Sequence, residues 1–316
     1  MMQRWIWAAS IAGVALLAAA PLLGDAVLVQ YGINALLFAT LAQSWNIIGG
    51  FTGYPSFGNS VFYGLGAYGT AIAMVQFGLP FAAGLAFGAL LAMACALLIG
   101  LPVLRLRGHY FAIATLGVSA AMAAVISNLG IAGANVGLVL PLTRADNMFY
   151  ELALALLAVC VLAVAWIAQS RFGAGLVAIR EDEDAAASMG VNTTLYKTAA
   201  LVLSALFTAV AGGINAYWIT FIDPASAFDL TLIVRMVIMA MFGGPGTVFG
   251  PVLGAFVLSA VYELLASWIS TAAALLFGLV IVLSVIFMPR GLADLIGGLR
   301  RNGPAYLMQN VRLHRL

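Results

Sequence analysis

The sequence predicts an all-α membrane protein, a polytopic transmembrane helical bundle of about ten spans, within a range of about 8–10. Hydrophobic residues make up 64% of the 316 residues and charged residues only 8%, whereas a soluble domain carries roughly 25% charged residues. A helix needs roughly 20 apolar residues to cross a bilayer, so the chain has room for such a bundle and for no large soluble domain. Two glycine-rich interruptions add the expectation of broken or re-entrant helices.

Apolar runs place the spans in order along the chain. The first run follows Arg4 and has the charge and length of a signal peptide, but no clear small-residue cleavage site follows it, so an uncleaved helix is predicted. The third run is amphipathic and the eighth is short, which leaves the count as a range. The predicted spans are Trp5–Leu23, Val27–Ile48, Ser60–Gly78, Phe81–Leu104, Tyr110–Leu129, Phe149–Gln169, Thr198–Trp218, Leu230–Phe242, Pro251–Trp268 and Ala272–Met288.

Positive charges set the predicted orientation, because cytoplasmic loops are enriched in Lys and Arg. With both termini in the cytoplasm, Arg144 falls in an outer loop, Arg235 falls within a span, and the other Lys and Arg residues lie on the inner face. The transmembrane domain is expected over residues 5–289, and the basic tail 290–316 on the cytoplasmic membrane surface. A net charge of +2, spread this thinly, offers no face for nucleic acid. The inner residues are Arg4, Arg105, Arg107, Arg171, Arg180, Lys197, Arg290, Arg300, Arg301, Arg312 and Arg315.

The long inner loop, residues 170–197, carries an unbroken run of acids from Glu181 to Asp184. Asp184 or an earlier acid can cap a short helix over the following alanines, and Gly190 can end it. The acids can be a solvated run that pairs with Arg180, a Mg²⁺ site for a diphosphate substrate, or part of a helix that docks on a cytoplasmic motor subunit. A diphosphate site is typically built from two facing acidic motifs, and the chain has one acidic cluster.

Two glycine-rich segments, residues 49–59 and 242–255, interrupt the apolar runs. Glycine permits unusual backbone angles and close helix contact, so these segments predict hinges or broken helices, with plain helix packing as the alternative. Neither is a nucleotide-binding loop, because a Walker A motif needs a lysine and Lys197 is the only lysine in the chain. The candidate hinge residues are Gly49, Gly50, Gly53, Gly58, Gly243, Gly244, Gly246, Gly250 and Gly254.

Polar and aromatic side chains gather around the first glycine-rich segment and suit a path for a polar solute, although hydrogen bonds between helices explain them equally well. Arg235 and Glu263 are predicted at similar depth in the outer part of the bundle. There they can pair with each other, face a solute path, or extend to the membrane interface. The candidate path residues are Gln43, Trp45, Asn46, Tyr54, Asn59, Tyr63, Arg235 and Glu263.

Several segments resemble one known family over most of the chain, from about residue 41 to residue 295. They are similar to the bacterial ABC importer permeases for branched-chain amino acids, and specifically to the second permease subunit of that system. The segments that carry the resemblance are Ala178–Lys197, Ser44–Tyr68, Arg105–Gly117, Phe242–Ala255 and Phe287–Leu292.

The resemblance implies a heteromeric importer in the bacterial cytoplasmic (inner) membrane. Besides the lipid bilayer, the expected partners are a related second permease subunit, two cytoplasmic ABC ATPase subunits and an extracytoplasmic solute-binding protein. This chain would then be a transport subunit without enzymatic activity, cofactor or metal, because ATP and Mg²⁺ bind to the ATPase subunits. The inner loop would carry the coupling helix, through Arg180, Glu181, Asp182, Glu183, Asp184, Ala185, Ala186, Met189 and Gly190.

The chain departs from the family on the presumed solute side. Residues 132–137 replace a Gly-Gly-x-Asn-Gly motif common in the outer loop, residues 119–122 lack an acid often found in the fifth span, and Arg235 stands where many members have an acid. Branched-chain amino acids are the first expectation for the substrate, with urea, amides and other small organic solutes as alternatives. A secondary transporter would need buried acids, and Glu263 is the only acid deep in a predicted span; a membrane enzyme would need a convergent catalytic set, which the chain lacks.

Overall fold

The structure is a computed structural model that describes residues 26–143 and 145–268, together with residues 278 and 292. The predicted first span, Trp5–Leu23, lies outside these residues, as do the last predicted span and the basic tail except for residues 278 and 292. The described elements are α2 (Ala26–Trp45), η2 (Asn46–Gly50), α3 (Asn59–Val75), α4 (Phe81–Val103), α5 (His109–Ser127), η3 (Gly130–Ala132), η4 (Ala134–Val136), β1 (Leu138–Val139), α6 (Asp146–Gln169), α7 (Arg171–Glu181), α8 (Glu183–Ser188), α9 (Thr193–Ile219), β2 (Phe221–Ile222), α10 (Pro224–Ala227), α11 (Leu230–Gly243) and α12 (Gly250–Trp268).

Six helical stretches in the described residues are long and apolar enough to cross a membrane. The all-helical, multi-pass class is therefore confirmed, whereas the count of about ten is not. One reason is that α3, the helix at the predicted third span, ends at Val75 and has only 17 residues. The six stretches are Ala26–Gly50, Phe81–Val103, His109–Ser127, Asp146–Gln169, Thr193–Ile219 and Pro224–Gly243, and α12 contributes a shorter apolar helix.

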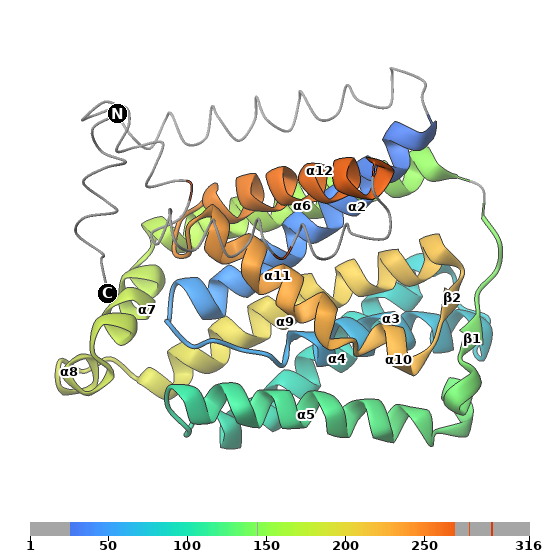
Figure 1. Ribbon diagram of the computed structural model, residues 1–316. Coiled ribbons are helices and arrows are strands. Elements are labelled where there is room, and N and C mark those ends of the chain that lie inside the picture. The colour runs from blue at the N-terminus through green and yellow to red at the C-terminus, as the bar shows by residue number, and fades with distance from the viewer. Residues whose placement is uncertain (1–25, 144, 269–277, 279–291, 293–316) are drawn as a thin grey trace.

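The long helices run roughly side by side and stack into one bundle (Figure 1). α5 lies at one side of the stack and α12 at the other, with α3, α4 and α9 between them. α7 and α8 stand at one end of the bundle, which we call the α8 end. At the opposite end, which we call the strand end, β1 pairs antiparallel with β2, with Leu138 opposite Ile222.

α3 occupies the centre of the bundle, and 14 of its 17 residues are buried. Its amphipathic pattern does not mark a side that faces water, because neighbouring helices cover its polar face as well. Glycine makes this close packing feasible: a methyl group at Gly66 would lie 2.1 Å from the carbonyl oxygen of Ala209 on α9, and one at Gly69 would lie 2.6 Å from Gly88 on α4. Small residues let helix backbones approach in this way inside a membrane.

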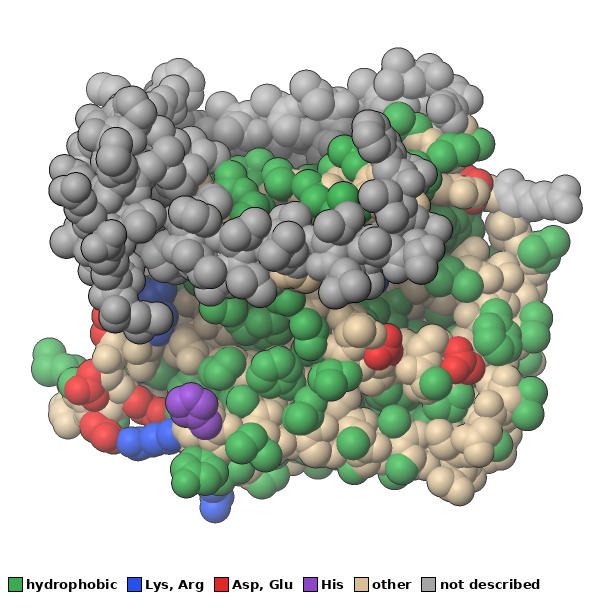
Figure 2. All heavy atoms as spheres, in the orientation of Figure 1, with side chains coloured by type: hydrophobic (Ala, Val, Ile, Leu, Met, Phe, Trp, Pro, Cys, Tyr) green, Lys and Arg blue, Asp and Glu red, His purple; other side chains and the backbone are tan. Residues whose placement is uncertain are grey.

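Hydrophobic side chains cover much of the flank of the bundle, while visible charged side chains concentrate toward its two ends (Figure 2). α5 has the most open flank, since it buries only Phe111, Thr115, Ser119 and Ile126. An apolar flank between polar ends is the surface expected of a protein that lies in a lipid bilayer.

Candidate functional site

The loop at the α8 end folds into two capped helices. The Ser170 hydroxyl accepts a hydrogen bond from the Gly173 N–H at 3.1 Å at the start of α7. An Asp182 carboxylate oxygen accepts one from the Ala185 N–H at 3.0 Å at the start of α8, and Gly190, with a φ of +87°, follows its end. The predicted short helix with an acidic cap and a terminal glycine is therefore present. α7 was not predicted, because its two glycines lower intrinsic helix propensity.

A group of polar side chains, which we call the anchor cluster, fixes α8 to the bundle. The Lys197 ammonium donates to Glu183 Oε1 at 2.6 Å and to the Tyr54 hydroxyl at 3.1 Å. It also donates to the Leu104 carbonyl at 2.9 Å, and the Tyr54 hydroxyl donates to Glu183 Oε2. The cluster thereby joins α8 to α9, to the residue after α4 and to the loop after η2. Its members are Tyr54, Arg107, Glu183, Asp184 and Lys197.

Arg107 extends the anchor cluster toward solvent. Its guanidinium donates two hydrogen bonds to Asp184, at 2.8 and 2.9 Å, and lies 3.7 Å from Glu183. The hydrogen bonds from Arg107 hold the pKa of Asp184 below its ordinary value. This pairing ties the short connection between α4 and α5 to the first turn of α8.

The buried part of the anchor cluster is electrostatically self-consistent. Lys197 is only 3% exposed, and an ammonium so far from water needs a paired charge. Burial favours the neutral form of Glu183, but hydrogen bonds from Lys197 and Tyr54 outweigh it and lower the pKa of this carboxyl. Burial, then the hydrogen bond to Glu183, raises the pKa of Tyr54. At neutral pH Glu183 is therefore ionised and Tyr54 keeps its proton as a donor.

Arg180, at the end of α7, contacts both glycine-rich segments. Its Nη1 donates to the Gly50 carbonyl at 3.2 Å. A methyl group at Gly53 or at Gly246 would lie 2.7 Å from Arg180 side-chain atoms, and both glycines have positive φ angles, +71° and +76°. Glycine is required at these two positions both by the backbone conformation and by the approach of Arg180.

The two glycine-rich segments are also bound directly to each other. Asn46 donates to the Thr247 carbonyl at 2.9 Å and accepts from the Gly246 N–H at 2.7 Å. Gln43 donates to the Val248 carbonyl at 2.9 Å. The amide groups of two predicted path residues therefore serve as ties between the segments.

Both predicted interruptions of the helices are present. The first begins with the π-helical turn η2, a feature common at functional sites, and the chain is non-helical over residues 51–58; the second is non-helical over residues 244–249. Gly243 and Gly254 bring α11 against α12, since a methyl group at Gly254 would lie 2.2 Å from the Met239 carbonyl oxygen. The role of the candidate hinge glycines in movement stays a prediction.

Other candidate path residues near η2 have partners within the protein. Trp45 donates to the Ser56 carbonyl at 2.8 Å, and the Asn59 amide donates to the Ser204 hydroxyl at 2.9 Å. The Tyr63 hydroxyl accepts from Asn215 at 2.6 Å. These side chains and Tyr54 therefore make contacts within the bundle, while the Asn59 Oδ1 is buried and has no hydrogen-bond partner among the described residues. Their place along a solute path stays a prediction.

The surface of α8 is buried on one side and exposed on the other. Ala186 is buried, at 5% exposure, and packs against the bundle, whereas Met189 is 86% exposed. Glu181 also faces solvent, where it pairs with Arg180 at 2.9 Å. The residues open to a partner therefore include Glu181 at the end of α7, Ala185 on α8 and Met189 just after it, while Ala186 packs against the bundle.

Arg235 and Glu263 line one cavity of about 780 Å³, which we call the charged cavity. Its walls come from the first half of α2 and from α6, α11 and α12, toward the strand end of the bundle. The predicted similar depth of the two charges agrees with this placement. Within the part of the chain that the structure describes, no salt bridge joins them.

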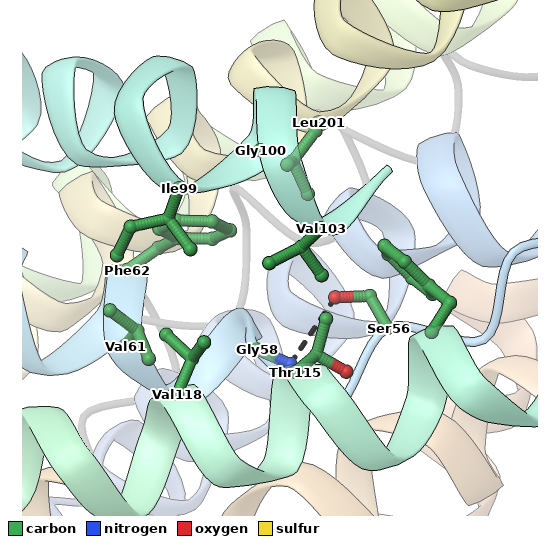
Figure 3. A pocket seen from close by; sticks show the side chains of 11 residues that line it. Ser56, Gly58, Val61, Phe62, Ile99, Gly100, Val103, Thr115, Val118 and Leu201 are labelled. Carbon is green, nitrogen blue, oxygen red and sulfur yellow. Dashed lines mark hydrogen bonds between the residues drawn. The ribbon is translucent and has the colours of Figure 1, made fainter. Parts of the chain in front are cut away.

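A second cavity, between α3, α4 and α5, has a volume of about 20 Å³. Apolar side chains, among them Phe62, Ile99 and Val118, surround it (Figure 3). Such a space holds about one water molecule, so it cannot take an organic solute.

Two members of the anchor cluster, Arg107 and Lys197, were not among the predicted site residues. A signal for Lys197 was present, because the only lysine of the chain stands at the start of a long apolar helix. Arg107 carried no comparable signal, since one more basic residue in a predicted inner loop is ordinary. Their partners could not be identified without the fold.

A multi-pass apolar bundle with broken helices and a polar helical loop anchored at one end is the architecture of a membrane permease subunit. The chain belongs to the family described as branched-chain amino acid transport system / permease component, which matches residues 27–287. It is thus a permease component of the ABC transporter class.

Individual relatives agree with the family. The chain is 29% identical to the high-affinity branched-chain amino acid transport system permease protein LivM of Salmonella typhimurium, over 84% of this chain and 69% of that protein. LivM of Escherichia coli is also 29% identical, over 81% of this chain and 68% of that protein. The autoinducer 2 import system permease protein LsrC of Photorhabdus luminescens is 34% identical over 33% of each chain. No solved structure matches the chain significantly.

Proposed function

We propose that this chain is the membrane-spanning permease subunit of an ATP-driven importer of a small polar solute, with branched-chain or related amino acids as the substrate class. The family and the LivM relatives support the substrate class. The chain itself hydrolyses nothing: ATP and Mg²⁺ bind to two cytoplasmic ABC ATPase subunits. A related second permease subunit completes the membrane bundle, and an extracytoplasmic binding protein delivers the solute.

The α8 end faces the cytoplasm in this proposal. The membrane is the bacterial cytoplasmic membrane, and both termini lie on its inner side. Three of the predicted inner basic residues support the orientation, because Arg107, Arg180 and Lys197 all contact α8 or the segments beside it. The transmembrane domain is residues 5–289, the coupling loop is residues 170–197, and the tail 290–316 lies on the cytoplasmic surface.

One observation carries the mechanism: the coupling loop contacts both breaks in the helical bundle. Arg180 binds Gly50 and lies against Gly246, while Glu183 binds Lys197 at the start of α9. A displacement of α7 and α8 by the ATPases is therefore transmitted to the end of α2, to the start of α12 and to α9. Nucleotide drives transport by binding one of the two bundle states more tightly than the other.

A second candidate is an importer of the same family for a different small organic solute, such as urea or an amide. The similarity to LsrC, whose name refers to autoinducer 2 import, shows the breadth of solutes within reach of related sequences. A secondary transporter has less support, since in the described spans Glu263 is the one acid that lines the charged cavity.

Uptake by the reconstituted complex tests the proposed function. Proteoliposomes that contain the complete complex and its binding protein are supplied with radiolabelled leucine, with ATP or without it. Uptake is expected only with ATP, and it is expected to vanish when the ATPase subunits carry a substitution that blocks ATP hydrolysis. Solute uptake that persists without ATP or without the ATPase subunits would contradict the proposal.

A further inference from the structure

The charged cavity has the size and walls of a small-molecule site. Its volume of about 780 Å³ lies within the roughly 300–1,000 Å³ that is usual for ligand pockets. Much of its lining is apolar, with Phe38 from α2, Met239 from α11 and Phe256 from α12. Such walls suit a ligand with an apolar side chain.

Two opposite charges line this space from different helices. Arg235 lies on α11 and Glu263 on α12, and both side chains are partly exposed rather than open to bulk solvent. Charged groups within membrane spans are costly and are retained for pairing or function. Among the described residues, neither Arg235 nor Glu263 has a salt-bridge partner. Ion pairing within the described part of the chain therefore does not explain why these two charges are present.

Tyr262 orients the cation. The guanidinium carbon of Arg235 lies 4.5 Å from the centroid of the Tyr262 ring, a cation–π contact. A cation–π contact is an attraction between the positive charge and the ring face, so it does not use the guanidinium N–H groups that can bind the two oxygens of a carboxylate.

A buried hydroxyl adds a third polar group to the same lining. Ser259 lies one helical turn before Glu263 on α12 and lines the cavity. Its Oγ is buried and has no hydrogen-bond partner within the described part of the chain. A buried hydroxyl left unpaired is unfavourable, and a polar ligand group in the cavity would satisfy it.

We propose that the charged cavity binds the zwitterionic backbone of an α-amino acid during transport. Arg235 binds the carboxylate and Glu263 binds the ammonium group. The Ser259 hydroxyl donates to the carboxylate or accepts from the ammonium, and the ligand side chain lies on Phe38 and Phe256. This inference rests on the proposed permease function and assigns its substrate class to particular residues. A zwitterion neutralises both protein charges, whereas urea or an amide would leave both unpaired.

The first test is the initial rate of leucine uptake at saturating binding protein and ATP. Arg235→Met and Glu263→Gln are each expected to lower this rate about tenfold or more, because each removes the protein charge that pairs with one end of the zwitterion. The matched control is Glu151→Gln, which neutralises an exposed acid on α6 outside the cavity. The control is expected to keep the wild-type rate, and all variants are checked for assembly with the ATPases.

A second measurement detects ligand in the cavity directly and needs no binding protein. It tests the inference even if Arg235→Met fails to assemble with the ATPases. In a background with Cys95→Ala and Cys160→Ala, Ser259→Cys is labelled with a maleimide in proteoliposomes. Leucine is expected to slow the labelling. 3-Methylbutylamine, which lacks the carboxylate, and 4-methylpentanoate, which lacks the ammonium, are expected to have no effect. Val136→Cys, at an 81% exposed position in η4 outside the cavity, is the control whose labelling leucine leaves unchanged.

The outcomes separate this inference from the proposed function. ATP-dependent leucine uptake with unchanged rates for Arg235→Met and Glu263→Gln, or with no protection of Ser259→Cys by leucine, would overturn the inference alone. ATP-dependent uptake of urea without amino-acid uptake would likewise overturn it and leave an ATP-driven permease. Uptake that needs no ATP would overturn the proposed function itself.

Discussion

Lys197 is the residue on which the attachment of α8 depends. Lys197 is only 3% exposed, and its ammonium has three acceptors, of which Glu183 at 2.6 Å supplies the compensating charge. Removing one partner of a buried ion pair is far more costly than removing both, because the remaining charge stays desolvated. The pair therefore specifies one position of α8 on the bundle.

A double-mutant cycle measures this dependence. Lys197→Met is expected to lower the free energy of unfolding by about 3 kcal/mol. The double variant Lys197→Met/Glu183→Gln is expected to lose less than the sum of the two single losses, with a coupling energy of about 1–3 kcal/mol. The measurement is thermal unfolding of the purified chain in detergent. Glu181→Gln is the control, because its exposed pair with Arg180 contributes about 1 kcal/mol or less. Additive losses would show that the pair does not act as a unit.

At the residue scale, features set by neighbours in the sequence were predictable, whereas contacts between distant residues were not. The acidic cap of α8 and its terminal glycine follow from neighbours within a few residues, so they were predictable. The partners of Asn46 and Gln43 lie about 200 residues away in the sequence. A solute path and hydrogen bonds between helices were both open for these amides, because nothing in a single sequence shows that Thr247 and Val248 lie beside them. The solute path stays a prediction.

At the scale of elements, close contact between helices depends on a few glycines. α3 crosses α9 at Gly66 and Gly212, and a methyl group at either would lie within 2.3 Å of the facing backbone. Long apolar helices were placed correctly from hydropathy, since each predicted span in the described region contains a helix. The burial of α3 on all sides was not predicted, because its Ser, Asn and Tyr side chains bind other helices rather than water.

Two alanine substitutions with opposite expected effects test this contact. Gly66→Ala is expected to lower stability by about 1–3 kcal/mol, the usual cost of overpacking a filled core. Gly117→Ala on α5 is the matched control: nothing lies within 4 Å of the added methyl group, so it is expected to be neutral or to stabilise by up to about 1 kcal/mol. The midpoint of thermal unfolding in detergent measures both. Equal effects at the two positions would argue against a tight α3–α9 contact.

At the scale of the whole molecule, the sequence predicted the membrane-protein class and the positions of the charged residues along the chain. It did not predict the contacts between the coupling loop and the two glycine-rich segments. The low charge content indicated a membrane bundle, and the family resemblance agrees with the match to residues 27–287. The contacts that join the coupling loop to both glycine-rich segments pass through Arg180, whose partners Gly50 and Gly246 are distant in sequence. Three separate features of the sequence therefore form one continuous structure at the α8 end.

Transport in the proposed importer depends on contact between the exposed residues of α8 and Met189 and a cytoplasmic ATPase. The most direct measurement is co-purification of the ATPase subunits with Met189→Asp, accompanied by ATP-driven uptake of the same preparation. Val136→Asp is the matched control, since Val136 is 81% exposed and Met189 is 86% exposed, but Val136 lies in η4 near the strand end. We predict that Met189→Asp inserts normally and loses both the ATPase and uptake, while Val136→Asp retains the ATPase. Full ATPase association and uptake by Met189→Asp would contradict the account.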